Sequence, residues 1–322
     1  MGVDVKDSGG ITPLRDDGVP SALTHESLIA LDYLSVPKAL EGLVTTFYHF
    51  RCDEKVIRDV HPAAVGHVIV FLRGTGRLIF AEGRADPSYP VAVLTPSCAA
   101  ALIEVDGPFH CVGAALSPAG WASFTGLHAA EWSDRLLPAT QVFGPAVEQL
   151  GDSLIAAYRD GTAATALCER LAELLMAQAR PLNPRHLALI RAAADWLGQS
   201  LDPPTEAFYQ IGPYSRRQTQ RLIERYYGLS PRELKRKYRA LRAATLLGMP
   251  DVSDGEIAAT VDLFCDQSHL IREIRHFCGR TPKRLAGEDD TILSALLDVR
   301  NFRIIKPQIA VMPETLIEND SQ

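Results

Sequence analysis

The stretch IAATVDLFCDQSHLIREIRHFCGRTP, residues 257–282, decides the fold of the C-terminal half. Asp266 is a good helix N-cap, and Gly279 is the residue type that most often follows a helix end. Between them, three apolar residues recur on one side at helical spacing: Leu270, Ile274 and Phe277. We therefore expect a helix over 266–278, preceded by a shorter helix over 254–262. Two short helices joined by a tight turn form a helix–turn–helix unit.

A second unit of the same kind lies upstream. A short helix is expected over 204–211 and a longer one over 215–227, which begins at Ser215 and ends before Gly228. The connecting helix, 230–247, opens with Ser-Pro-Arg-Glu, the pattern of a capping box with proline in the first turn. At 1.5 Å per residue this helix is roughly 27 Å long. It could set two recognition helices about one DNA turn, ~34 Å, apart.

Charge within the chain is unevenly distributed. The whole sequence carries a net charge of −6, yet residues 212–284 contain 15 Lys and Arg against 8 Asp and Glu. Within that segment, residues 215–243 hold 10 basic and 2 acidic residues. A basic block inside an acidic chain is typical of a module that binds a polyanion, although a solvated helix face would look the same by charge alone.

The two longer helices present polar side chains opposite their apolar sides. Arginine and glutamine can each form bidentate hydrogen bonds with base edges in the major groove. The candidate base contacts are Arg217, Gln220 and Arg221 in the first unit and Gln267, Ser268, His269 and Arg272 in the second. The candidate phosphate contacts are Arg216, Arg225, Ser230, Arg239 and Thr281.

Residues 257–282 resemble the signature of AraC/XylS-type transcription regulators. The matching residues are Gln267-Ser268-His269, Arg272, Gly279 and Thr281-Pro282, and the segments 215–222, 228–234 and 239–247 resemble the first unit and linker helix of the same family. The resemblance covers about 185–286 and implies a double helix–turn–helix domain whose base-facing positions are the seven named above. Two departures are Leu263, where the family usually has glycine, and Pro213 in the first turn.

The sequence pattern of the N-terminal half predicts a series of short β-strands. Apolar runs separated by turn residues occur at 43–50, 67–73, 77–82, 91–96, 100–105 and 109–116. The segment 73–77, Arg-Gly-Thr-Gly-Arg, is expected to be a hairpin turn. Such strands favour a sandwich or small barrel. Residues 109–134 resemble the cupin-like sensory domain of some AraC-type regulators, which implies a ligand sensor or a dimerisation module.

The predicted fold class is therefore α+β. The N-terminal part is a cupin-like β-barrel with flanking helices, and the C-terminal part is an all-α domain of two helix–turn–helix units. An apolar stripe in 144–178 indicates either core packing or a dimer seam. The expected divisions are a flexible arm 1–24, a β-rich sensory domain 25–135, a helical linker 136–182, a DNA-binding domain 183–288 and a tail 289–322.

Little in the sequence favours catalysis or a bound metal. His49, His61, His67 and His110 lack the spacing of a cupin metal site, and no nucleophile or paired-carboxylate signature stands out, so we expect no enzyme, cofactor or metal. The six cysteines form no C-x-x-C pair, which favours reduced thiols in the cytoplasm. Barrel arginines could hold a carboxylate, but surface positions are favoured for each: Arg51, Arg58, Arg73 and Arg77.

These features predict a cytoplasmic, sequence-specific transcription regulator. Its expected partners are double-stranded DNA, a small-molecule effector, a second copy of itself and, if it activates, RNA polymerase. No apolar run is long enough to predict a membrane span. Two alternatives remain open: a regulator without a small ligand that is controlled by a protein partner, and a cupin-type metal enzyme tethered to DNA. The operator, the effector and the role of the 289–322 tail are not predicted.

Overall fold

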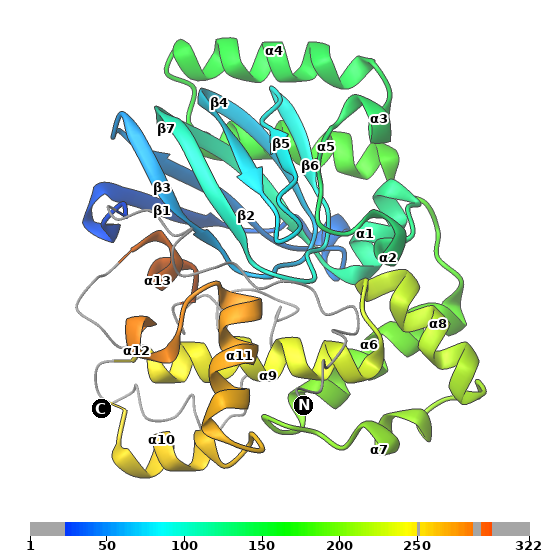
Figure 1. Ribbon diagram of the computed structural model, residues 1–322. Helices are drawn as coiled ribbons and strands as arrows, with labels where there is room; N and C mark the ends of the chain where they lie inside the picture. Colours follow the sequence, from blue (N-terminus) through cyan, green and yellow to red (C-terminus); the bar gives the residue numbers. More distant parts are fainter. Residues whose placement is uncertain (1–22, 250–251, 286–290, 298–322) are drawn as a thin grey trace, which may run out of the picture.

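A computed structural model describes residues 23–249, 252–285 and 291–297 (Figure 1). An eight-stranded antiparallel sheet forms the N-terminal half, and helices form the C-terminal half, which confirms the α+β class. The strands are β1 (Ile29–Leu34), β2 (Val44–Cys52), β3 (Val56–His61), β4 (His67–Ile79), β5 (Ala85–Pro87), β6 (Val91–Leu94), β7 (Ala101–Leu116) and β8 (Leu136–Pro138). Their order is β1-β2-β7-β4-β6-β8, with β3 beside β7 and β5 beside β4.

The helices follow the sheet in the chain. Around the sheet lie α1 (Pro118–Thr125), α2 (Ala129–Trp132), α3 (Thr140–Phe143), α4 (Ala146–Arg159) and α5 (Ala164–Gln178), with short 3-10 turns at Glu26–Leu28 and Lys38–Leu40. The C-terminal half contains α6 (Pro184–Gly198), α7 (Thr205–Tyr209), α8 (Arg216–Tyr227), α9 (Pro231–Leu247), α10 (Asp254–Val261), α11 (Gln267–Cys278), α12 (Pro282–Leu285) and α13 (Ile292–Leu297). In the part of the chain that the structure describes, none of these helices is long and apolar enough to cross a bilayer.

The first half of β4 and the second half of β7 are covered on both faces, which explains their nearly continuous apolar runs. On one face of β4 and β7, side chains such as Val68, Val70 and Val112 belong to a core cluster with α4 and α5. On the opposite face, Ile69, Phe71 and Cys111 line a cavity that faces the C-terminal half. The alternation follows from the two-residue period of a strand. The sheet is thus packed between α4 and α5 on one side and the helical C-terminal half on the other (Figure 1).

The expected hairpin turn at 73–77 is wrong. Residues 67–79 form one strand, β4, which pairs with β7 on both sides of this segment with two register shifts. Gly74 has φ +79°, and a Cβ there would lie 2.5 Å from the carbonyl oxygen of Pro108. The two glycines therefore allow a bulged strand to approach β7 closely rather than reverse the chain. Likewise, the runs predicted as two strands at 100–105 and 109–116 form one strand, β7, from Ala101 to Leu116.

The expected boundary between 135 and 136 also needs correction. Residues 136–138 form β8, which pairs with β6, so the sheet extends into the segment predicted as a helical linker. Most of the apolar stripe of 144–178 is core packing, because Val147, Leu154 and Leu171 are buried against the sheet, whereas Met176 is exposed. The predicted arm, apart from residues 23 and 24, and the tail, apart from residues 291–297, lie outside the described residues.

Candidate nucleic-acid interface

The first recognition helix is α8. The Ser215 side chain accepts a hydrogen bond from the backbone N–H of Gln218, and Gly228 ends the helix with φ +83°. Ile223 and Tyr226 are buried on its inner side. The predicted base contacts all lie on the exposed side: Arg217, Gln220 and Arg221. Gln220 donates to Glu224 Oε1 at 2.8 Å, an exposed contact that DNA could replace.

The second recognition helix, α11, is built in the same way. The Asp266 carboxylate accepts from the backbone N–H of His269 at 2.8 Å, and Gly279 ends the helix with φ +78°. Its exposed residues include three of the predicted base contacts: Gln267, Ser268 and Arg272. Leu263 does not distort the unit, since among the described non-glycine residues only Asp134 has a positive φ. The backbone at Leu263 therefore does not adopt the positive φ that would favour glycine at this position.

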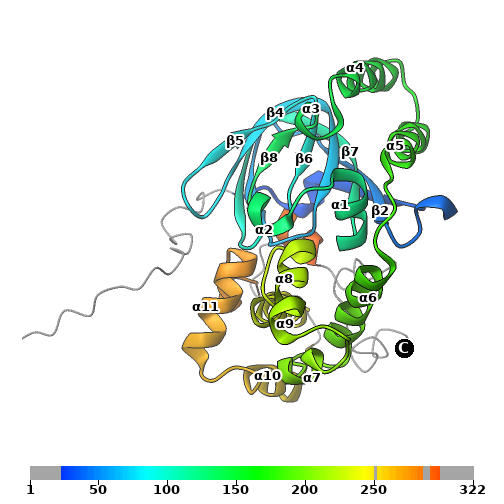
Figure 2. The same cartoon turned by 90° about the vertical axis from the view of Figure 1, so that its right-hand side faces the viewer.

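The connecting helix α9 joins the two units as predicted. Ser230 and Glu233 form a complete capping box, with Pro231 in the first turn. Figures 1 and 2 show α11 crossing the middle of α9 and α8 beside its N-terminal end, each with its C-terminal end directed toward the sheet. The N-terminal turns of both helices therefore face away from the sheet. Those turns carry exposed polar side chains, the arrangement that enters a major groove.

Loops beside the strands of the sheet hold α9 and the C-terminal end of α11. The Ala63 and Ala100 N–H groups donate to the carbonyls of Phe277 and His276, in the last turn of α11, at 2.7 and 3.0 Å. Lys237 on α9 is buried, and its ammonium donates to the carbonyls of Ala64 and Ser97 at 2.9 and 2.8 Å. Burial lowers the pKa of Lys237 to about 8. These contacts fix the helix–turn–helix units relative to the sheet.

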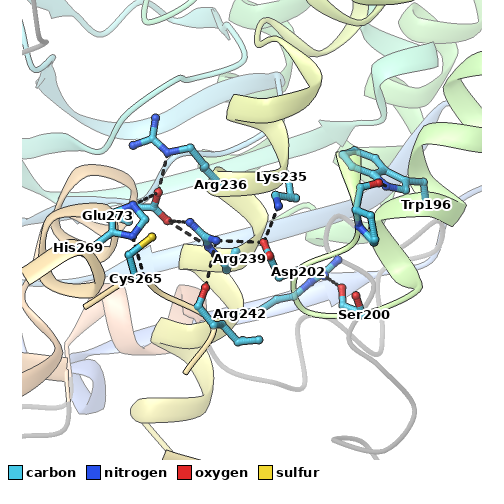
Figure 3. Close-up of polar contacts among 12 residues, drawn as sticks. Trp196, Ser200, Asp202, Lys235, Arg236, Arg239, Arg242, Cys265, His269 and Glu273 are labelled. Atoms are coloured by element: carbon cyan, nitrogen blue, oxygen red, sulfur yellow. Dashed lines mark hydrogen bonds and ion pairs between the residues drawn. The ribbon is translucent and has the colours of Figure 1, made fainter. Parts of the chain in front are cut away.

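A buried ionic cluster joins α9 to α11 (Figure 3). Glu273 is 1% exposed, and its carboxylate binds Arg236 Nε at 2.6 Å, Arg239 Nη2 at 2.6 Å and His269 Nε2 at 2.9 Å. Arg239 also contacts Asp202 at 3.0 Å and lies over the Phe264 ring. Burial raises the pKa of Glu273, but hydrogen bonds from the two arginines outweigh this effect and hold the pKa below its usual range.

The ionic cluster corrects several predicted contacts. Arg239, predicted to bind phosphate, is 7% exposed and fully engaged inside the protein. His269 uses both ring nitrogens internally, with Glu273 and the N–H of Cys265, so a base contact would require it to leave them. Arg242 is buried, donates to the carbonyl of Ser200, and its pKa is lowered to about 10 by burial. Part of the basic block is therefore structural.

The other predicted phosphate contacts lie nearer the surface. Arg216 is exposed but forms a bidentate pair with Glu206, at 2.5 and 2.8 Å, above the Tyr209 ring. Arg225 is exposed, while Ser230 and Thr281 are partly exposed near the starts of α9 and α12. Arg217, Arg221 and Arg272 make no ion pair with any described residue, which leaves their charge available to DNA.

A cavity of about 230 Å³ lies between the sheet and the C-terminal half. Of the four histidines and four arginines weighed above, only His61, His67 and Arg77 line it. Arg77 is paired with Glu104 at 2.6 Å, so no arginine is placed to bind a buried carboxylate alone. Among the described residues, no three His, Cys, Asp or Glu side chains are grouped to hold a metal ion. The residues on the other side of the cavity could not be predicted from the sequence, because Leu241 and α13 are far from the sheet along the chain.

Comparisons with known proteins identify a helix-turn-helix domain in the helical half. Residues 213–287 match the family model of a helix-turn-helix domain. The domain is of the AraC type, as the motif at 257–282 predicted. A search of the curated proteins gives no match. Among solved structures, the chain is similar to the AraC-like transcriptional activator CuxR at 12% identity, over 68% of this chain and 88% of that chain. The TM-score is 0.25, too low to establish a shared overall arrangement.

Proposed function

We propose that this protein is a non-enzymatic, sequence-specific transcription regulator that reads two adjacent major grooves with α8 and α11. The observation that carries the proposal is the pair of similarly capped helices whose exposed N-terminal turns carry Arg217 and Arg272. The AraC-type domain supports DNA binding by a transcription regulator. Base-facing side chains supply sequence choice, and the remaining exposed cations supply affinity for phosphate.

The sheet half acts in this proposal as a sensor for a small molecule. The cavity supports this role over control by a protein partner alone, because a mainly apolar cavity with a few polar side chains is the usual form of a small-molecule site. Pairing of two chains, and contact with RNA polymerase if the protein activates, remain predictions. A metal enzyme is not favoured, since no described cluster of metal ligands lies in the cavity.

Salt-dependent binding to duplex DNA tests the proposed function. Anisotropy titrations of the full-length protein on a 30-base-pair random duplex should give a logarithm of affinity that falls linearly with the logarithm of salt concentration. Arg225→Ala should reduce the slope by about 1, because one phosphate contact is lost. The control is Arg159→Ala, which removes the same charge from α4 on the far side of the sheet. Salt-independent binding, or an equal effect of both variants, would contradict the proposal.

A further inference from the structure

The cavity is bounded by both halves of the chain. Alternate residues of four neighbouring strands supply the walls, for example Tyr33, Tyr48, Ile69 and Cys111. The opposite side is closed by Leu241 of α9 and by three residues of α13: Ile292, Leu296 and Leu297. A molecule in the cavity would therefore touch the sheet, the helix between the two helix–turn–helix units and the helix that follows them.

The lining is mainly apolar, with a small group of neutral polar side chains. Tyr48 Oη lies 3.2 Å from His67 Nδ1, and the His61 ring meets the His67 ring edge-to-face. Burial lowers the pKa of His67 to about 3 and also lowers that of His61, so both rings are neutral at pH 7. The only cationic side chain among the described lining residues is Arg77, already paired with Glu104.

The hydrogen-bonding pattern of this polar group favours a hydroxyl. The carbonyl of Pro62 can only accept, so His61 Nδ1, 2.9 Å away, carries its proton and donates. His61 Nε2 is then left as an acceptor. Tyr48 can donate or accept, and a Cβ at Gly113 would collide with its hydroxyl, so the glycine makes room for this side chain. A hydroxyl group both donates and accepts, whereas a carboxylate only accepts and would be buried without a cation.

The two halves are also tied together beside the cavity. Asp59 of β3 is fully buried, pairs with Arg280 and accepts from the N–H of Leu293 at 3.0 Å. Arg280 donates in turn to Thr291 Oγ1 at 2.7 Å. This cluster anchors the first turn of α13 to the sheet. The position of Leu296 and Leu297 against the cavity is thus coupled to the end of the DNA-binding domain.

We propose that the cavity binds an uncharged, mainly apolar molecule with one hydroxyl group, and that the bound molecule holds α9 and α13 against the sheet. The hydroxyl lies at Tyr48, His61 and His67, and the apolar body reaches Leu241 and α13. The cavity exceeds the ~150 Å³ apolar cavity that holds one benzene, so a medium-chain alcohol is a suitable probe. The regulatory part of this inference rests on the proposed function, since α9 belongs to the DNA-binding domain.

Ligand binding is tested by calorimetry on the full chain without DNA, with 1-nonanol and nonanoate as matched probes. We expect 1-nonanol to bind and nonanoate to bind at least ~100-fold more weakly at pH 7.5, because its charge would be buried unpaired. Ala115→Leu, which fills the cavity, should abolish binding, and Tyr48→Phe should weaken it about three- to tenfold. Equal binding of both probes, or 1-nonanol binding that is absent or survives Ala115→Leu, would overturn the proposed site.

Closure by α13 is tested by hydrogen exchange on the same DNA-free protein. If α13 must release the ligand to open, 1-nonanol at ten times its Kd should slow exchange in 291–297 about tenfold. Exchange in α10, which is remote from the cavity lining, should not change. Leu297→Ala, which removes a side chain of the cavity lining, should weaken 1-nonanol binding. Unchanged protection of α13 would refute the coupling, and a failure to bind DNA would affect neither result.

Discussion

Glu273→Ala is expected to lower the free energy of unfolding by about 3–5 kcal/mol, because it leaves buried arginine charge without its partner. Glu273 binds Arg236, Arg239 and His269 at once, and Arg239 is itself 7% exposed. Urea unfolding of the full-length protein at pH 7 measures the loss. Glu224→Ala on α8 is the matched control, since its partner Gln220 is exposed, and it should cost less than about 1 kcal/mol.

Two further measurements separate charge from packing in this variant. Replacing both partners, as Glu273→Leu with Arg239→Met, should be less destabilising than Glu273→Ala alone. The pKa of Glu273 is lower in the folded than in the unfolded chain, so its contribution is present above the ordinary pKa of 4.5 and is lost as pH falls below it. The difference between wild type and Glu273→Ala should therefore shrink on acidification. A difference that is small at pH 7 would show that the cluster contributes little.

Gly279→Ala is expected to destabilise the protein by about 2–5 kcal/mol, from a left-handed backbone and from overpacking. Gly279 has φ +78°, and a Cβ there would lie 2.3 Å from Val60 Cγ1 and 3.2 Å from Ala100 Cβ. The α11 end would have to move away from the sheet. Thermal unfolding followed by circular dichroism measures the change.

Gly228→Ala isolates the contribution of the left-handed backbone. Gly228 ends α8 with φ +83°, but a Cβ there would meet its neighbours only at 3.6 Å or more. This variant should show the backbone cost of about 1–2 kcal/mol alone. Adding Val60→Ala to Gly279→Ala should recover part of the lost stability, because the clashing methyl group is removed. Equal effects of the two glycine variants would mean that α11 is not closely docked on the sheet.

Local signals in the sequence were enough to place the helical half. The caps at Ser215, Ser230, Ser253 and Asp266 all accept backbone hydrogen bonds at the predicted helix starts. Capping is a short-range interaction, so one sequence contains all the partners. The exposed positions of Arg217, Gln220, Arg221, Gln267, Ser268 and Arg272 follow from helical periodicity for the same reason.

Contacts between distant segments were not predictable in this way. Arg239 was assigned to phosphate because its charge was visible and its partners Asp202 and Glu273, both more than 30 residues away, were not. Gly74 and Gly76 were interpreted as part of a hairpin turn, because glycine is common both in turns and in β-bulges. Only the pairing of β4 with β7 shows that the segment is a bulged strand. The cavity floor combines residues 241 and 292–297 with the sheet, which no local pattern reveals.

Selection of bound sequences from random duplex DNA tests the central claim most directly. The full-length protein at about 150 mM salt should enrich a motif of two blocks about one helical turn apart, one for each recognition helix. Arg217→Ala and Arg272→Ala should each lose about 1–3 kcal/mol of discrimination, each in a different block. A single block, no enriched motif, or the same change in both variants would contradict an account in which α8 and α11 read separate major grooves.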